Sequence, residues 1–194
     1  MRTSNHGIIV GALCLTALLA SAPRASAQMI DITGLAREQA AAVVITGSTS
    51  HADYMPVKAF DGNYTASSGR WLGLKPFPPA HIDYHLPDDW QPGKNVVLGT
   101  YILMRLPSNT YYYWERMPTA FTLSGSNDGG ATWTELDSRS GVSWSAAASN
   151  VYEIASPAPC RSYRFTALSS SSTDTAPIGL GELIFMGELL SATD

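Results

Sequence analysis

The chain has 194 residues, with 12 lysines and arginines, 16 aspartates and glutamates, and a formal net charge of −4 at pH 7. Because the basic residues form no cluster, nucleic acid and anionic membrane surfaces are disfavoured as partners. After the first 27 residues, no segment is apolar for long enough to predict a membrane span.

The N-terminus predicts a secretory signal peptide, residues 1–27. Arg2 lies in a short polar start, residues 8–20 are almost wholly apolar, and Ala25-Ser26-Ala27 forms a small-x-small cleavage site. Cleavage after Ala27 would leave 167 residues, with 10 of the 12 basic residues and all 16 acidic ones, and so a net charge of −6. We therefore expect a secreted or periplasmic protein. Its one remaining cysteine, Cys160, is expected to be a buried thiol.

The rest of the chain predicts short strands separated by clusters of Gly, Pro, Ser and Asn. Residues 35–42 favour one helical turn. Within 81–86, Ile82, Tyr84 and Leu86 alternate with polar residues, which is the period of a strand. Further strands are predicted at 41–46, 96–106, 121–123, 133–136, 151–154, 163–167 and 183–186. About eight strands and almost no helical periodicity predict one all-β domain, a β-sandwich or jelly roll.

The stretch Ser126-Asn127-Asp128-Gly129 predicts a hairpin turn of the primed type. Such a turn needs positive φ, which Gly129 accepts freely and Asp128 tolerates, and Trp133 can pack its ring over it. Residues 126–133 also match the Asp-box pattern S-x-D-x-G-x-T-W of sialidases. One copy cannot build a propeller, so we interpret the stretch as structural.

His81, Asp83 and His85 share one face of their predicted strand and are therefore a candidate metal cluster. Neighbouring side chains on one strand face stand about 7 Å apart, so three in a row close poorly on one ion. We interpret them as an exposed polar strand face.

Several segments, in the same order along the chain, resemble the discoidin domain (coagulation factor 5/8 type C). Residues 59–63, Arg70-Trp71 and 82–86 are similar to its first half, and 118–129 to its most recognisable run. Residues 163–165 and 181–187 look like its last two strands. The resemblance implies a galactose-binding-like β-sandwich jelly roll of antiparallel strands over 41–188. Residues 28–40 would then form an N-terminal lead-in, and 189–194 a C-terminal tail.

Many bacterial members of this family are family 32 carbohydrate-binding modules, and several hold a structural calcium beside the first conserved loop. Calcium takes six to eight oxygens at flexible angles, which suits a tight polar loop. Carried over to this chain, the resemblance implies a site made of Lys58 (through its carbonyl), Asp61, Asn63, Thr65 and Glu182. The family has Thr or Ser where this chain has Ala66, so either Thr65 substitutes or the site is incomplete. The alternative is a plain turn in which Asp61 caps backbone amides.

The aromatic stretch 111–116 is the candidate sugar-binding surface. Sugar recognition needs an aromatic face with hydrogen-bonding groups around it. The alternative is that these rings pack onto the flank of the sandwich. Because family lectins use a His and an Arg in such loops, the candidate ligand-binding residues are His51, Arg70, Tyr111, Tyr113, Trp114 and Arg116. Trp71 is expected in the core.

We therefore expect a non-catalytic, lectin-like module that binds a glycan. The alternative is an adhesion or assembly protein that binds protein or lipid through the same loops, which an apolar loop tip at Tyr54-Met55-Pro56 would favour. A glycoside hydrolase is a remote alternative, because it needs two carboxylates across a cleft and the acids here are scattered. Single sugar sites are commonly weak, so we also expect weak homo-oligomerisation.

Overall fold

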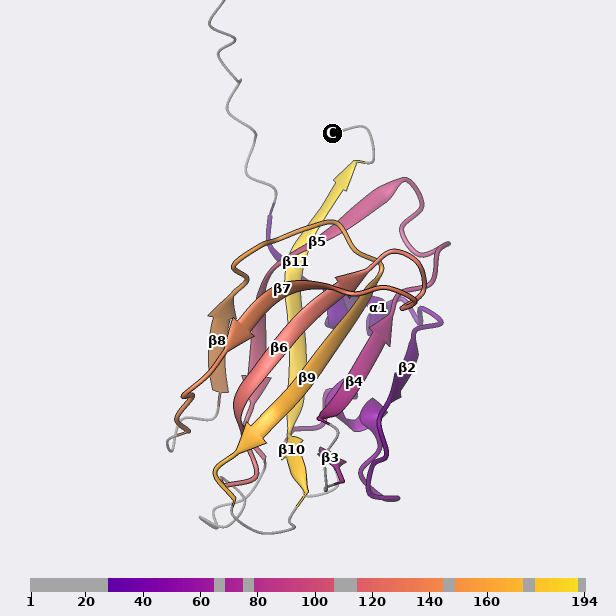
Figure 1. Ribbon diagram of the computed structural model, residues 1–194. Coiled ribbons are helices and arrows are strands. Elements are labelled where there is room, and N and C mark those ends of the chain that lie inside the picture. The colour runs from indigo at the N-terminus through magenta and orange to yellow at the C-terminus, as the bar shows by residue number, and fades with distance from the viewer. Residues whose placement is uncertain are drawn as a thin grey trace, which may run out of the picture.

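The computed structural model describes residues 28–64, 69–74, 79–106, 115–144, 149–172 and 177–191. These residues form two antiparallel sheets that face each other, with a small third sheet at one end (Figure 1). The predicted all-β sandwich is therefore confirmed, while the predicted signal peptide lies outside the described residues. Among those described, no helix is long and apolar enough to cross a membrane.

The larger sheet has five strands in the order β2–β4–β9–β6–β7. Its strands are β2 (Val44–Gly47), β4 (Ala80–His85), β6 (Pro118–Ser126), β7 (Thr134–Arg139) and β9 (Ser162–Ser170). The second sheet has the order β1–β11–β5–β8. Its strands are β1 (Ile30–Asp31), β5 (Lys94–Met104), β8 (Ser149–Glu153) and β11 (Glu182–Ser191). The third sheet pairs β3 (Trp71–Gly73) with β10 (Ile178–Leu180).

The described ranges also contain two short helices, α1 (Ile32–Glu38) and the 3-10 helix η1 (Pro56–Ala59). Asp31 caps α1, because its carboxylate accepts hydrogen bonds from the Gly34 amide and the Thr33 hydroxyl, both at 2.7 Å. The segment 28–40 thus contributes β1 and α1 to the sandwich. At the other end, β11 pairs with β5 as far as Ser191, three residues past the boundary expected at 188.

Aromatic side chains from both sheets fill the space between them. Alternate residues of each strand point inward, so the apolar members of the period-two patterns meet there. The largest fully buried residues are Trp71, Tyr101, Tyr163, Phe121, Phe165 and Phe185. The expected burial of Trp71 and Cys160 is confirmed, at 0% and 6% exposure.

The turn between β6 and β7 lies one residue later than predicted, because the Ala131 amide donates to the Asp128 carbonyl at 3.4 Å around Gly129 and Gly130. The positive φ angles fall at Gly129 (69°) and Gly130 (91°) and not at Asp128. The Asp128 carboxylate instead accepts hydrogen bonds from the Thr132 hydroxyl (2.5 Å) and amide (2.9 Å), which hold its pKa well below the ordinary value. This side-chain bonding closes the loop around that turn. The ring of Trp133 lies against Gly130, as expected.

The expectation of an exposed polar face on β4 is wrong for Asp83. Its side chain is buried, because Arg164 stands directly opposite on β9 and covers it. The guanidinium donates to both carboxylate oxygens, at 2.7 and 2.8 Å, and lies 4.4 Å from the Trp133 ring centroid. Nδ1 of His85 is hydrogen-bonded to the Ser162 hydroxyl at 2.8 Å.

Candidate functional site

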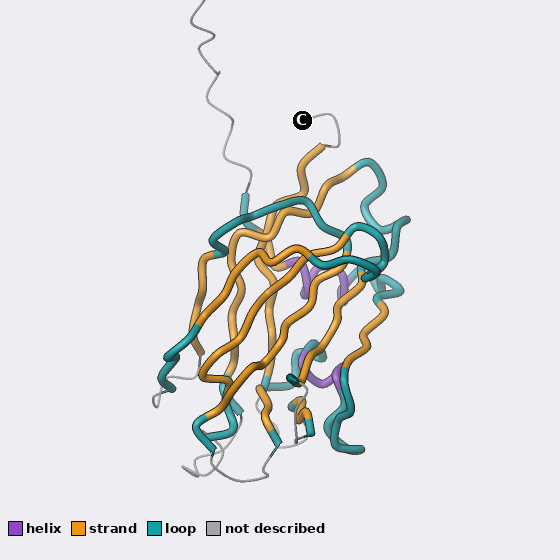
Figure 2. Tube along the Cα trace, viewed as in Figure 1, coloured by secondary structure: helices purple, strands orange, loops and turns teal. Residues whose placement is uncertain are grey.

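Three of the predicted ligand residues lie at one end of the sandwich, on segments joined by backbone hydrogen bonds. The His51 amide donates to the Leu72 carbonyl at 3.0 Å. Leu72 pairs with Gly179 across β3 and β10, and the Gly179 amide donates to the Arg116 carbonyl at 3.0 Å. Because Arg70 directly precedes β3, it belongs to the same end. Loops gather there, beside β3 and β10 at the bottom of Figure 2.

His51 and Arg70 are brought together by Tyr54. The Arg70 guanidinium lies 4.5 Å from the centre of the Tyr54 ring, and its Nη2 donates to the Tyr54 hydroxyl at 3.1 Å. The His51 ring lies on the same tyrosine, with ring centroids 5.1 Å apart. The Leu72 amide fixes this loop by donating to the Tyr54 carbonyl at 3.0 Å. The result is a cluster of an imidazole, a phenol and a guanidinium, named here the His51–Tyr54–Arg70 cluster.

The three side chains differ in their access to solvent. The side chain of His51 is 47% exposed and Tyr54 is half-buried, whereas Arg70 is only 7% exposed. Nδ1 of His51 accepts a hydrogen bond from the Asp53 amide at 3.4 Å, so Nε2 carries the N–H of the ring. Arg70 therefore supports Tyr54 from inside, while His51 and the edge of Tyr54 face water.

Tyr54 was not among the residues that the sequence selected for ligand contact. Its position three residues after a histidine in a Ser- and Thr-rich loop was the available signal. Tyr111, Tyr113 and Trp114 lie outside the described residues. Arg116 is half-buried, next to Glu115, whose carbonyl accepts a hydrogen bond from the Ser172 amide at 2.8 Å.

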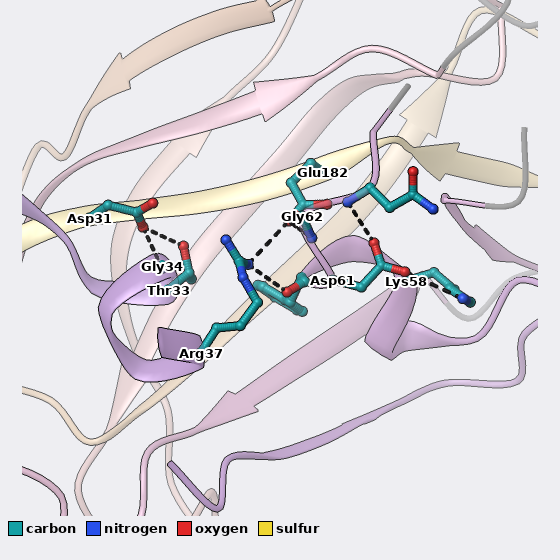
Figure 3. Close-up of polar contacts among 10 residues, drawn as sticks. Asp31, Thr33, Gly34, Arg37, Lys58, Asp61, Gly62 and Glu182 are labelled. Atoms are coloured by element: carbon teal, nitrogen blue, oxygen red, sulfur yellow. Dashed lines mark hydrogen bonds and ion pairs between the residues drawn. The ribbon is translucent and has the colours of Figure 1, made fainter. Parts of the chain in front are cut away.

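The loop predicted to hold calcium lies between α1 and the start of β11 (Figure 3). Asp61 accepts a hydrogen bond from the Asn63 amide at 2.9 Å, and its other oxygen lies 3.3 Å from the Lys58 ammonium. Glu182 accepts from the Gly62 amide at 2.9 Å. These contacts correspond to the alternative of a turn whose Asp caps a backbone amide.

Two protein cations lie against the carboxylates of this loop. Nη1 of Arg37 is 3.9 Å from Glu182 Oε1 and donates a hydrogen bond to the Phe60 carbonyl at 3.0 Å. The Lys58 ammonium forms an ion pair with the Asp61 carboxylate. Glu182 is 1% exposed, and this burial raises its pKa to about 7. Its Oε2 is buried and has no hydrogen bond among the described residues. Since calcium requires six to eight oxygens, these residues do not fit the ion as they lie.

Calcium at this loop stays a prediction of the family resemblance, and Thr65 lies outside the described residues. In the described ranges, this loop included, no three His, Cys, Asp or Glu side chains gather into a metal-binding group.

A hollow of about 340 Å³ lies at the opposite end of the sandwich, between the β6–β7 loop and residues 158–160. Several of its polar side chains are bonded within the protein. Asn127 donates to the Pro159 carbonyl at 2.7 Å, and Ser126 and Thr132 both donate to Asp128. The polar side chains of Ser126, Asn127 and Asp128 in the hollow are therefore engaged within the protein.

No protein-family model and no curated protein matches the sequence. Solved structures, in contrast, share its fold. The family 32 carbohydrate-binding module of Clostridium perfringens NanJ, solved in complex with galactose, is 14% identical with a TM-score of 0.55, covering 74% of this chain and 93% of that one. An F5/8 type C domain from Bacteroides fragilis is 15% identical with a TM-score of 0.57, covering 77% and 93%.

A fragment of a putative chitobiase from Bacteroides thetaiotaomicron is 14% identical with a TM-score of 0.60, covering 87% of this chain and 97% of that one. At such low identity the likeness shows the fold and not the ligand. The chain therefore has the discoidin-like β-sandwich fold of carbohydrate-binding modules and F5/8 type C domains, which confirms the resemblance seen in the sequence.

Proposed function

We propose that this protein is a secreted or periplasmic, non-catalytic module that binds a carbohydrate through His51 and Tyr54, with Arg70 behind them. The observation that carries the proposal is the His51–Tyr54–Arg70 cluster, assembled from two loops at one end of a discoidin-like sandwich. Proteins of this fold have been solved with galactose and with GalNAc-β-1,3-galactose.

The chemistry of the cluster suits a neutral sugar. The Nε2–H group of His51 can donate a hydrogen bond to a hydroxyl of the sugar. The Tyr54 hydroxyl can accept a hydrogen bond from the sugar or donate one to it. The guanidinium of Arg70 polarises that hydroxyl and holds it in place, so little side-chain entropy is lost when a ligand binds.

A buried carboxylate with a raised pKa is often a catalytic acid, so Glu182 must be considered as one. It is 1% exposed and bonded to the Gly62 amide. Hydrolysis of a glycosidic bond needs two carboxylates that face the bond from opposite sides. The burial of Glu182 supports a structural role for it and a non-catalytic protein.

A second candidate function is the binding of a protein or lipid surface. Met55 and Val57, at the same end, are 55% and 48% exposed. Such apolar side chains are typical of interaction surfaces when they form a contiguous patch. Against this function, Tyr54 in the same loop turns toward Arg70 and Pro56 is buried.

A glycan array distinguishes carbohydrate binding from the binding of a protein or lipid surface. The wild-type protein is expected to bind a related set of glycans, and His51→Ala and Tyr54→Phe to lose about tenfold in affinity, since each removes one hydrogen bond to the ligand. Val151→Ala, at a site 63% exposed on β8, serves as the control and should bind as the wild type. If folded wild-type protein binds no glycan but sediments with liposomes, and Met55→Ser abolishes this, the second function is correct.

A further inference from the structure

The loop of residues 60–63 requires a positive charge. The side chain of Glu182 is 2% exposed, and a buried carboxylate is costly unless a cation or hydrogen-bond donors compensate it. Only one of its oxygens has a hydrogen bond, from the Gly62 amide. Asp61, one residue earlier, adds a second negative charge nearby.

Arg37 supplies such a charge from α1. One nitrogen of its guanidinium, Nη1, lies 3.9 Å from Glu182 and also donates to the Phe60 carbonyl at 3.0 Å. Figure 3 shows this side chain reaching from the end of α1 toward the loop, between Asp61 and Glu182 on one side and Asp31 on the other. The Arg37 guanidinium thus lies near one carboxylate and bonds one backbone carbonyl, which are the two kinds of oxygen that coordinate a calcium ion.

Gly62 allows the guanidinium to approach the backbone. Its φ is +76°, a left-handed conformation that favours glycine. A Cβ at this position would stand 3.1 Å from the Arg37 guanidinium carbon. The residue therefore serves both the turn and the close packing of Arg37.

Lys58 balances the remaining carboxylate, since its ammonium lies 3.3 Å from Asp61. Arg37 and Lys58 thus place two positive side chains beside the carboxylates of Glu182 and Asp61. A divalent ion placed among them would be repelled by both positive side chains.

We propose that Arg37 is a built-in cation for the loop of residues 60–63, which keeps its conformation without a divalent metal ion. α1 is well suited to hold it, because Asp31 caps the helix and Ile32 and Ala36 anchor it with 0% exposure. Residues 28–40 therefore supply the positive charge that the family resemblance assigns to a calcium ion.

Thermal unfolding of the full-length protein, followed by circular dichroism, tests this proposal. The Tm of the wild type should agree within about 1 °C in excess EDTA and in added CaCl₂, because a ligand that does not bind cannot stabilise. Arg37→Met keeps much of the stem and removes the charge, and should lower Tm by about 3–6 °C. Arg37→Lys should recover at least about half of that loss. Glu38→Gln, at the exposed neighbouring position, is the control.

Three results would each overturn the proposal. The first is a wild-type Tm that falls in EDTA and rises with CaCl₂, or heat of calcium binding in a calorimetric titration of the wild type. The second is an Arg37→Met protein as stable as Glu38→Gln. The third is an Arg37→Lys protein no more stable than Arg37→Met, which would show that the residue acts by packing alone. The wild-type measurements do not depend on whether the variants fold.

Discussion

Replacing Asp83 by alanine should destabilise this protein strongly. The carboxylate accepts two charge-assisted hydrogen bonds from Arg164, at 2.7 and 2.8 Å, and the two side chains are 7% and 30% exposed. Asp83→Ala leaves a largely desolvated guanidinium on β9 without its carboxylate. The loss arises mainly from that unpaired charge, because hydrogen bonds between ions are stronger than neutral ones.

The expected cost is about 2–3 kcal/mol. Breaking a fully buried ion pair by removing one partner costs about 3–5 kcal/mol. Arg164 keeps some access to water and rests on the ring of Trp133, so the loss should fall below that range. For a chain of this size it corresponds to a decrease in Tm of about 4–12 °C.

Urea unfolding of the wild type, Asp83→Ala, Arg164→Ala and the double variant measures this pair. Because the double variant removes both charges, its loss should be smaller than the sum of the single losses by at least about 1 kcal/mol. Asp88→Ala, in the exposed loop after β4, should change stability by less than about 0.5 kcal/mol. Additive losses in the double variant, or an Asp83→Ala protein as stable as Asp88→Ala, would refute the reasoning.

Three further predictions concern the core, the pH response and assembly. Tyr101→Phe should cost about 1.5–3 kcal/mol in chemical unfolding, because the buried hydroxyl donates to Asp137 at 2.6 Å; an unchanged midpoint would contradict this. Burial lowers the pKa of His81 below 6.5, so the unfolded chain binds its proton more readily, and the free energy of unfolding should fall as the pH drops below about 6.5. His81→Gln should flatten that dependence, and an identical pH profile in this variant would exclude His81 as its source. Weak self-association should appear in light scattering as a mass that rises with concentration, whereas a constant monomer mass would rule it out.

Much of the fold could be predicted from local patterns. The alternation of Ile82, Tyr84 and Leu86 marks a strand with one buried face, and the register of β4 against β9 then places these residues in the core. Eight of the strands correspond to such patterns. β1, β3 and β10 are only two or three residues long, and a period of two cannot be recognised over so few positions.

The candidate site was predicted only in part. A histidine and an arginine in loops were recognisable from residue type and family resemblance, and the structure brings His51 and Arg70 together. His51 and Arg70 each contact the Tyr54 ring. The two loops meet because Leu72 of β3 forms backbone hydrogen bonds with both His51 and Tyr54. That pairing depends on the path of the whole chain.

Composition and periodicity by themselves thus determined the class of fold, the buried faces of the longer strands and the loops that carry polar residues. These properties depend on neighbours within a few positions. Tertiary structure alone decided the partners of individual charges. Arg164 covers Asp83 from 81 residues away, and Glu182 receives the Gly62 amide from 120 residues away. Such pairs depend on strand register and on which loops share an end of the sandwich, and both are set when the two sheets pack.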